Sequence, residues 1–143
     1  MWPHDTVIAA AGMAAYGRRD AALRVVGGLL DALEAFGGRL PELFCGFPRD
    51  EKPIPIPYPT SCSPQAWAAA TPFEMLRIVL DLRADATRGA LQALPSPSVI
   101  GEVHIGGLPF SGLRLGIDAD TREAHVDGLP SPARAEERGR MTP

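Results

Sequence analysis

The central stretch of this sequence is Arg39–Phe73, which carries two polar-aromatic segments, Arg39-Leu40-Pro41-Glu42-Leu43-Phe44-Cys45-Gly46-Phe47 and Ser61-Cys62-Ser63-Pro64-Gln65-Ala66-Trp67. A proline-dense connection, Pro48 to Pro59, joins them. In a saccharide site, polar groups bind hydroxyls, aromatic faces cover the apolar face of the ring, and a carboxylate handles protons. The stretch is therefore a candidate sugar site. The alternative is an ordinary solvated loop in which Glu42 has no role and Trp67 is a core residue.

Composition limits the class of protein. The 143 residues can form one domain, and the hydrophobic share of 45% is that of an ordinary soluble globular protein. A formal net charge of −3 gives no electrostatic case for a nucleic-acid or membrane partner. No signal peptide or transmembrane stretch of ~20 apolar residues is recognisable. We expect reduced, buried thiols at Cys45 and Cys62, and a cytoplasmic protein.

Before the central stretch, apolar residues at helical spacing predict an αα-hairpin. We expect Asp5-Thr6 to begin the first helix and Gly17 to end it, because glycine readily takes a positive φ at that position. Asp20 is the expected cap of the second helix, and Gly37-Gly38 its end. Gly27-Gly28 lies within this second helix at a cost of ~1 kcal/mol each, which close helix packing would justify.

The connection and the helix after it follow from proline chemistry. Alternating prolines exclude both a helix and an interior strand at Pro53–Pro59, so we expect an extended segment laid over the mouth of the site. A polyproline ligand for an SH3-like partner is the alternative. Ser63-Pro64 is the expected start of a third helix, with serine as the cap. Pro72 should kink or restart that helix.

The C-terminal third has the period-two alternation of half-buried strands. It predicts strands near residues 99–105 and 113–117 and a short one at 125–127, with turns at 106–109 and 118–120. We expect a small antiparallel β appendage over residues 95–130. Residues 131–143 are polar and rich in proline, arginine and glutamate, which predicts disorder.

Three segments in this order resemble a known family: Trp2-Pro3-His4-Asp5, Leu40-Pro41-Glu42-Leu43 and Ser61-Cys62-Ser63-Pro64-Gln65-Ala66-Trp67. They are similar to the C-terminal end of bacterial glycogen-debranching amylo-α-1,6-glucosidases, of the six-hairpin glycosidase superfamily. The likeness runs from Trp2 to about Leu82. It implies a mainly α fold, in which residues 1–94 form the last helical hairpins of an (α/α)6 toroid ahead of the β appendage.

The resemblance also implies a site. The glutamate of the Leu-Pro-Glu-Leu segment, here Glu42, is the family's general base in an inverting reaction. Gln65 alternatively caps its own helix, and the terminal segment is alternatively a frayed end. No cofactor is implied, and isolated histidines at 4, 104 and 125 exclude a metal motif. The candidate substrate-binding residues are Trp2, His4, Asp5, Phe44, Tyr58, Gln65 and Trp67.

The chain departs from the family in two ways. It supplies far fewer helices than a toroid needs, and the family's acid, an aspartate, has no counterpart in it. Our hypothesis is a C-terminal fragment of a glycosidase that keeps the base, acts on an α-glucan or oligosaccharide, and is completed by the missing N-terminal part of the toroid. The alternatives are a catalytically silent carbohydrate-binding or scaffold module, and a small helical protein-interaction domain.

Overall fold

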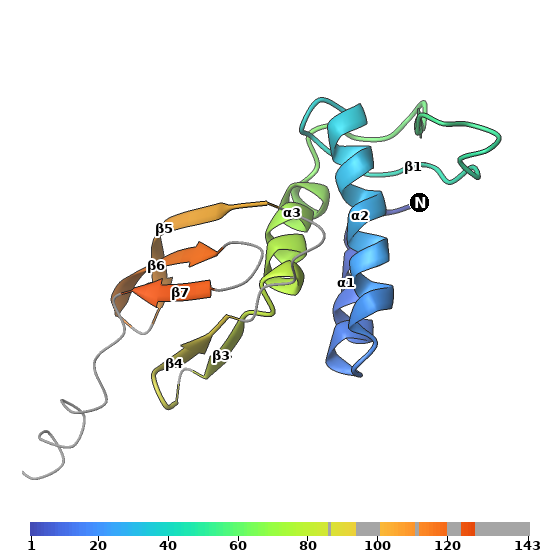
Figure 1. Cartoon of the computed structure of the whole chain (residues 1–143). Coiled ribbons are helices and arrows are strands. Elements are labelled where there is room, and N and C mark those ends of the chain that lie inside the picture. Colours follow the sequence, from blue (N-terminus) through green and yellow to red (C-terminus); the bar gives the residue numbers. More distant parts are fainter. Residues whose placement is uncertain (86, 94–100, 111, 120–123, 128–143) are drawn as a thin grey trace, which may run out of the picture. The chain divides into compact units, whose positions relative to one another are not determined.

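The computed structural model describes residues 1–85, 87–93, 101–110, 112–119 and 124–127, and it divides into two compact units, Met1–Val79 and Leu80–Pro143. Within the described residues there are three helices and three small antiparallel sheets (Figure 1). The fold is therefore mixed α/β, and the expectation of a mainly α toroid segment is wrong. The physical reason is that, in the described residues, only one pair of helices forms a hairpin. Beyond Val79 the described chain forms paired strands and no further helices.

Helix α1 (Pro3–Ala15) begins before the expected Asp5-Thr6 start, because Pro3 takes the first helical position, where its fixed φ and missing N–H are tolerated. The Thr6 hydroxyl instead donates to the Trp2 carbonyl, at 2.7 Å. Gly17 ends the helix at φ +74° as expected. The N–H of the next residue, Arg18, donates a hydrogen bond to the Met13 carbonyl, at 2.8 Å.

Helix α2 (Arg19–Ala35) completes the expected αα-hairpin. It starts one residue before the expected cap, Asp20, and ends where Gly37 adopts φ +65°. The N–H of Gly38 then donates to the Leu33 carbonyl, at 2.8 Å, which satisfies one of the last free carbonyls of the helix.

Helix α3 (Ala66–Val79) starts after Gln65 rather than at Ser63-Pro64. The Gln65 side-chain oxygen accepts the Ala68 N–H at 3.0 Å, so glutamine serves as the cap in place of serine. The helix continues through Pro72, and the expected restart is wrong. Packing of the buried face of α3 compensates for the one backbone hydrogen bond that Pro72 cannot donate.

The core of Met1–Val79 lies where α1 packs against both α2 and α3. The Arg19 guanidinium, at the start of α2, donates to the Val79 carbonyl at the end of α3, at 2.9 Å. A second cluster joins α2 and α3 to the connection between them, through Ala32, Leu40, Phe44 and Ala68. The main buried apolar residues of the three helices are Val7, Ala10, Ala22, Leu23, Val26, Leu29, Ala32, Ala68, Met75, Ile78 and Val79.

The long connection contains two short strands, β1 (Phe44–Cys45) and β2 (Ile56–Pro57), which pair antiparallel. The two strands form a sheet of their own, so the proline in β2 lies on an edge, where its missing N–H removes no interior ladder bond. This agrees with the expectation that the proline-rich segment is neither a helix nor an interior strand, although only Ile56–Pro57 of it is extended strand.

The second unit is built from β-hairpins. Strands β3 (Arg83–Asp85) and β4 (Ala90–Gln92) form a hairpin that the sequence did not indicate. Strands β5 (Val103–Phe110), β6 (Leu113–Ala119) and β7 (Ala124–Asp127) form an antiparallel sheet in that order, as expected. The buried residues of this unit include Leu91, Leu115 and Ile117.

Two expected turns in this unit are wrong. β5 continues through residues 106–109 with an irregularity between Ile105 and Leu108, because a bulge absorbs the two glycines without ending the strand. Asp118 and Ala119 belong to β6, where they pair with both neighbouring strands. The predicted disordered tail, 131–143, lies outside the described residues. Among the helices described, none has the length and apolarity of a membrane span.

Candidate functional site

The three segments that carry the family resemblance meet at one place in the Met1–Val79 unit. Met1 and Phe44 exchange backbone hydrogen bonds: the Phe44 N–H donates to the Met1 carbonyl at 3.0 Å, and the Met1 nitrogen donates to the Phe44 carbonyl. The Glu42 N–H donates to the Cys62 carbonyl, also at 3.0 Å. Residues 1–5, 40–47 and 61–67 are thus fastened together although they are far apart in the sequence.

Two hydrogen bonds to Cys62 hold Glu42 in place, one through its side chain and one through its backbone. Its Oε2 atom accepts the Cys62 N–H at 3.1 Å, in addition to the backbone bond between the same two residues. The preceding residues, Leu40 and Pro41, are buried and anchor this part of the loop. Glu42 itself is half-buried, and its Oε1 atom has no hydrogen-bond partner among the described residues. One carboxylate oxygen is therefore positioned and the other is available to a ligand or water.

Two exposed indoles, Trp2 and Trp67, each contact the ring of His4, and we call these three rings the Trp2–Trp67 surface. The Trp2 and His4 rings meet edge to face with centroids 5.5 Å apart, and the His4 and Trp67 rings lie 5.9 Å apart at 33°. Trp67 is 65% exposed and Trp2 42% exposed. The alternative of a core position for Trp67 is wrong, since the buried face of α3 runs through Ala68, Thr71 and Met75.

His4 contacts both indoles, and its two ring nitrogens differ in their surroundings. Nδ1 is buried and has no hydrogen-bond partner within the described residues. Nε2 lies 3.6 Å from Oδ1 of Asp5, whose carboxylate is largely exposed. The exposed polar group next to the two indoles is therefore the carboxylate of Asp5, with Nε2 of His4 close to it.

The remaining predicted substrate-binding residues, Phe44, Gln65 and Tyr58, do not form part of the Trp2–Trp67 surface. Phe44 is buried with its ring 5.4 Å from that of Phe36, so it packs in the core. Gln65 caps α3, which confirms the alternative given for it. Tyr58 is exposed on the connection after β2. Both cysteines are free; Cys62 is exposed, and the expectation of a buried thiol is wrong for it.

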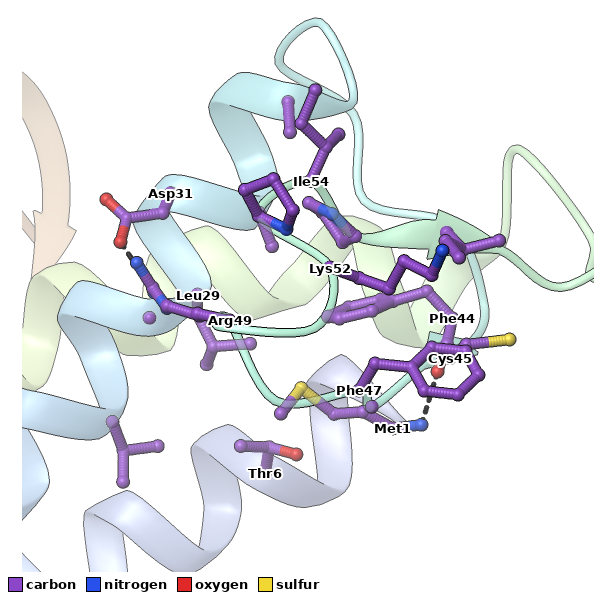
Figure 2. Close-up of a pocket in the computed structure, with 18 of the residues that line it drawn as sticks. Met1, Thr6, Leu29, Asp31, Phe44, Cys45, Phe47, Arg49, Lys52 and Ile54 are labelled. Carbon is purple, nitrogen blue, oxygen red and sulfur yellow. Dashed lines mark hydrogen bonds and ion pairs between the residues drawn. The ribbon is translucent and has the colours of Figure 1, made fainter.

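A cavity of about 470 Å³ lies between α2 and the connection. Phe44 is the one predicted site residue that lines it, while Glu42, the tryptophans and Gln65 do not. Residues 53–56 of the proline-rich segment line this cavity, and not the predicted sugar site whose mouth they were expected to cover (Figure 2). The signal for this cavity in the sequence is Gly28, where an added Cβ would lie 3.6 Å from the Arg49 guanidinium, so this glycine leaves the surface of α2 open to the loop.

No protein-family model matches this sequence, and no curated protein matches it significantly. The described residues also contain no group of three or more histidine, cysteine, aspartate or glutamate side chains arranged to hold a metal ion. The candidate site is accordingly defined by its own geometry: two exposed indoles around a histidine, and a fixed carboxylate on the adjoining loop.

Proposed function

We propose that this protein binds an α-glucan oligosaccharide at the Trp2–Trp67 surface. The observation that carries the proposal is the exposure of two large indole rings on either side of His4. Exposed indoles lose contact with water when a sugar's apolar C–H face covers them, and this burial is favourable. The resemblance to amylo-α-1,6-glucosidases supplies the substrate class.

Polar groups around the indoles match the other requirement of a sugar. Nε2 of His4 and the carboxylate of Asp5 can donate to and accept from ring hydroxyls. The free Oε1 of Glu42 adds an acceptor on the neighbouring loop. A neutral saccharide needs no strong field, which fits the small formal net charge of −3.

Trp67→Ala tests the proposal. We expect maltotriose to bind the wild-type chain in a ¹H–¹⁵N NMR titration with shifts at Trp2, His4 and Trp67. The variant should bind roughly 10-fold more weakly, since stacking on one aromatic ring is worth on the order of 1 kcal/mol. Phe73→Ala is the matched control, because Phe73 is an exposed ring on the same helix (75%) outside the Trp2–Trp67 surface. Absence of binding at millimolar maltotriose, or equal losses in both variants, would refute the assignment.

A second candidate function is glycoside hydrolysis with Glu42 as the base. The observation that favours it is the double attachment of Glu42 to Cys62, which fixes the orientation of the carboxylate against the segment that leads to Trp67. In the inverting reaction water attacks the anomeric carbon, the carboxylate takes the proton of that water, and the leaving oxygen is protonated by a second acid. This chain carries no counterpart of the family's acid.

α-Glucosyl fluoride tests this second candidate in the isolated chain, because fluoride leaves without being protonated and the acid is not needed. We expect fluoride release above the buffer rate, measured with an ion-selective electrode. Glu42→Gln should lower it by about 10²–10⁴-fold, whereas maltotriose binding should remain measurable because Trp2 and Trp67 are unchanged. If the wild-type chain releases no fluoride above background, hydrolysis by Glu42 is refuted, and saccharide binding is judged separately by the Trp67 experiment.

A further inference from the structure

The cavity between α2 and residues 44–56 differs in chemistry from the Trp2–Trp67 surface. Its floor is apolar, made by the buried side chains of Leu29, Ala32 and Phe44. Its volume of about 470 Å³ falls within the roughly 300–1,000 Å³ typical of small-molecule sites. The cavity is thus large enough to enclose a small organic molecule.

The outer wall of the cavity carries apolar side chains that the chain itself does not cover. Phe47 is 50% exposed, Ile54 68% and Ile56 37%. Figure 2 shows Phe47 and Ile54 on the loop that curves past α2. Removing these apolar groups from water lowers the free energy, so a ligand that covers them would be bound favourably.

The charges around the cavity are not balanced. Arg49 reaches from the loop to Asp31 on α2, with Nη2 2.6 Å from Oδ2 (Figure 2). Arg24 and Lys52 also line the cavity, and neither has an ion-pair partner among the described residues. The lining therefore holds three cationic side chains against one carboxylate. A negative group on the ligand would be attracted to these cations more strongly than the hydroxyls of a neutral sugar.

We propose that this cavity binds a small amphipathic anion, an aliphatic acid whose chain fills the apolar floor and whose acidic group lies near Arg24 and Lys52. The site is separate from the saccharide surface, because none of Trp2, His4 and Trp67 lines the cavity. The Arg49–Asp31 pair attaches the loop to α2 and keeps the outer wall in place. Apolar walls with a few placed polar groups are the usual composition of such sites.

Octanoate and its neutral analogue octanamide are the probes for the full chain, titrated by ¹H–¹⁵N NMR. We expect octanoate to shift signals of cavity residues such as Leu29 and Phe47, and to bind roughly 10-fold more tightly than octanamide, because a charge-assisted hydrogen bond is worth more than a neutral one. Maltotriose should not displace it.

Two variants separate charge from shape. Arg24→Met with Lys52→Met removes both unpaired cations from exposed positions, and should lower octanoate affinity roughly 10-fold while leaving octanamide unchanged. Gly28→Leu should lower the affinity for both probes by occupying the cavity. Arg18→Met is the control, since Arg18 is exposed and lies outside the cavity.

The proposal is overturned by any of three results. Octanoate at millimolar concentration leaves the cavity signals unmoved, octanamide binds as tightly as octanoate, or the double variant retains wild-type octanoate affinity. Failure of maltotriose to bind would not affect it, because the saccharide surface and the cavity are tested by different probes and different variants.

Discussion

At the scale of single residues, two positions at the start of α3 show how far sequence reasoning reaches. Gln65 and Trp67 lie two residues apart, and both were candidates for sugar contact. The cap at Gln65 was a recognisable alternative, because it depends on a bond to Ala68 only three residues away. The exposure of Trp67 was not recognisable, since it depends on which side of α3 meets α1.

His104 and Asp118 form another residue-scale feature, directly opposite each other on β5 and β6. The His104 Nδ1 atom is hydrogen-bonded to the Asp118 carboxylate, and this bond, followed by the negative charge itself, raises the pKa of His104 above its usual value. A raised folded-state pKa means that the protonated pair stabilises the fold. That stabilisation is complete below about pH 6.5, the unfolded value, and is lost as the pH rises through the folded pKa.

Asp118→Asn checks this linkage. We expect the NMR titration midpoint of the His104 ring protons to move down to the usual histidine range in the variant. In the wild type the unfolding free energy should fall as the pH rises above 6.5, and in the variant this fall should be smaller. The difference between the two should be slight, because both side chains are exposed. An unchanged midpoint in Asp118→Asn would contradict the role of the carboxylate.

At the scale of elements, glycine positions separate local from tertiary requirements. Gly37 ends α2 at φ +65°, a conformation that residues with a Cβ adopt only at a cost. Gly27 lies inside α2 with helical geometry, and an added Cβ would meet nothing within 4 Å. Close helix packing, expected from the Gly27-Gly28 pair, is therefore wrong for Gly27, and at Gly28 the neighbour is the Arg49 side chain.

The two glycines give opposite expected outcomes for the same substitution. Gly37→Ala should destabilise the protein by about 1–2 kcal/mol because alanine is strained at positive φ. Gly27→Ala should stabilise it by about 1 kcal/mol because alanine favours the helix and has room. Urea unfolding followed by circular dichroism measures both. Changes of the same sign in the two variants would show that one of these backbone assignments is wrong.

The strands show a similar division. Alternation of apolar and polar residues correctly located β6, β7 and the first part of β5, Val103–Ile105, because a two-residue period is a property of the sequence. The same alternation could not reveal the β3–β4 hairpin. Its three-residue strands, Arg83–Asp85 and Ala90–Gln92, are too short to express a period, and their stability comes from pairing with each other.

At the scale of the whole molecule, the fold consists of two compact units, each with its own buried cluster. In Met1–Val79, the cluster of Ala32, Leu40, Phe44 and Ala68 fixes the loop that carries Glu42. Leu40 connects the candidate site to the core, since it precedes Glu42 by two residues and is only 2% exposed.

Leu40→Ala should therefore destabilise the protein by about 2–5 kcal/mol, through lost burial and the cavity left behind. Chemical denaturation gives the change in unfolding free energy. Ile54→Ala is the control, because Ile54 is 68% exposed on the same connection and its truncation should cost no more than about 0.5 kcal/mol. A Leu40→Ala variant as stable as Ile54→Ala would show that the loop is not anchored through this residue.

The sequence by itself determined the αα-hairpin with its glycine stops, the extended proline-rich connection and the alternating strands of the C-terminal sheet. Each follows from dihedral limits or from a side-chain period that acts within a few residues. Only the tertiary structure decided that Glu42 attaches to Cys62, that Trp2 and Trp67 flank His4, and that Arg49 reaches Asp31. These contacts join segments many residues apart, and they form only when the packing of α1 against α2 and α3 brings the segments together.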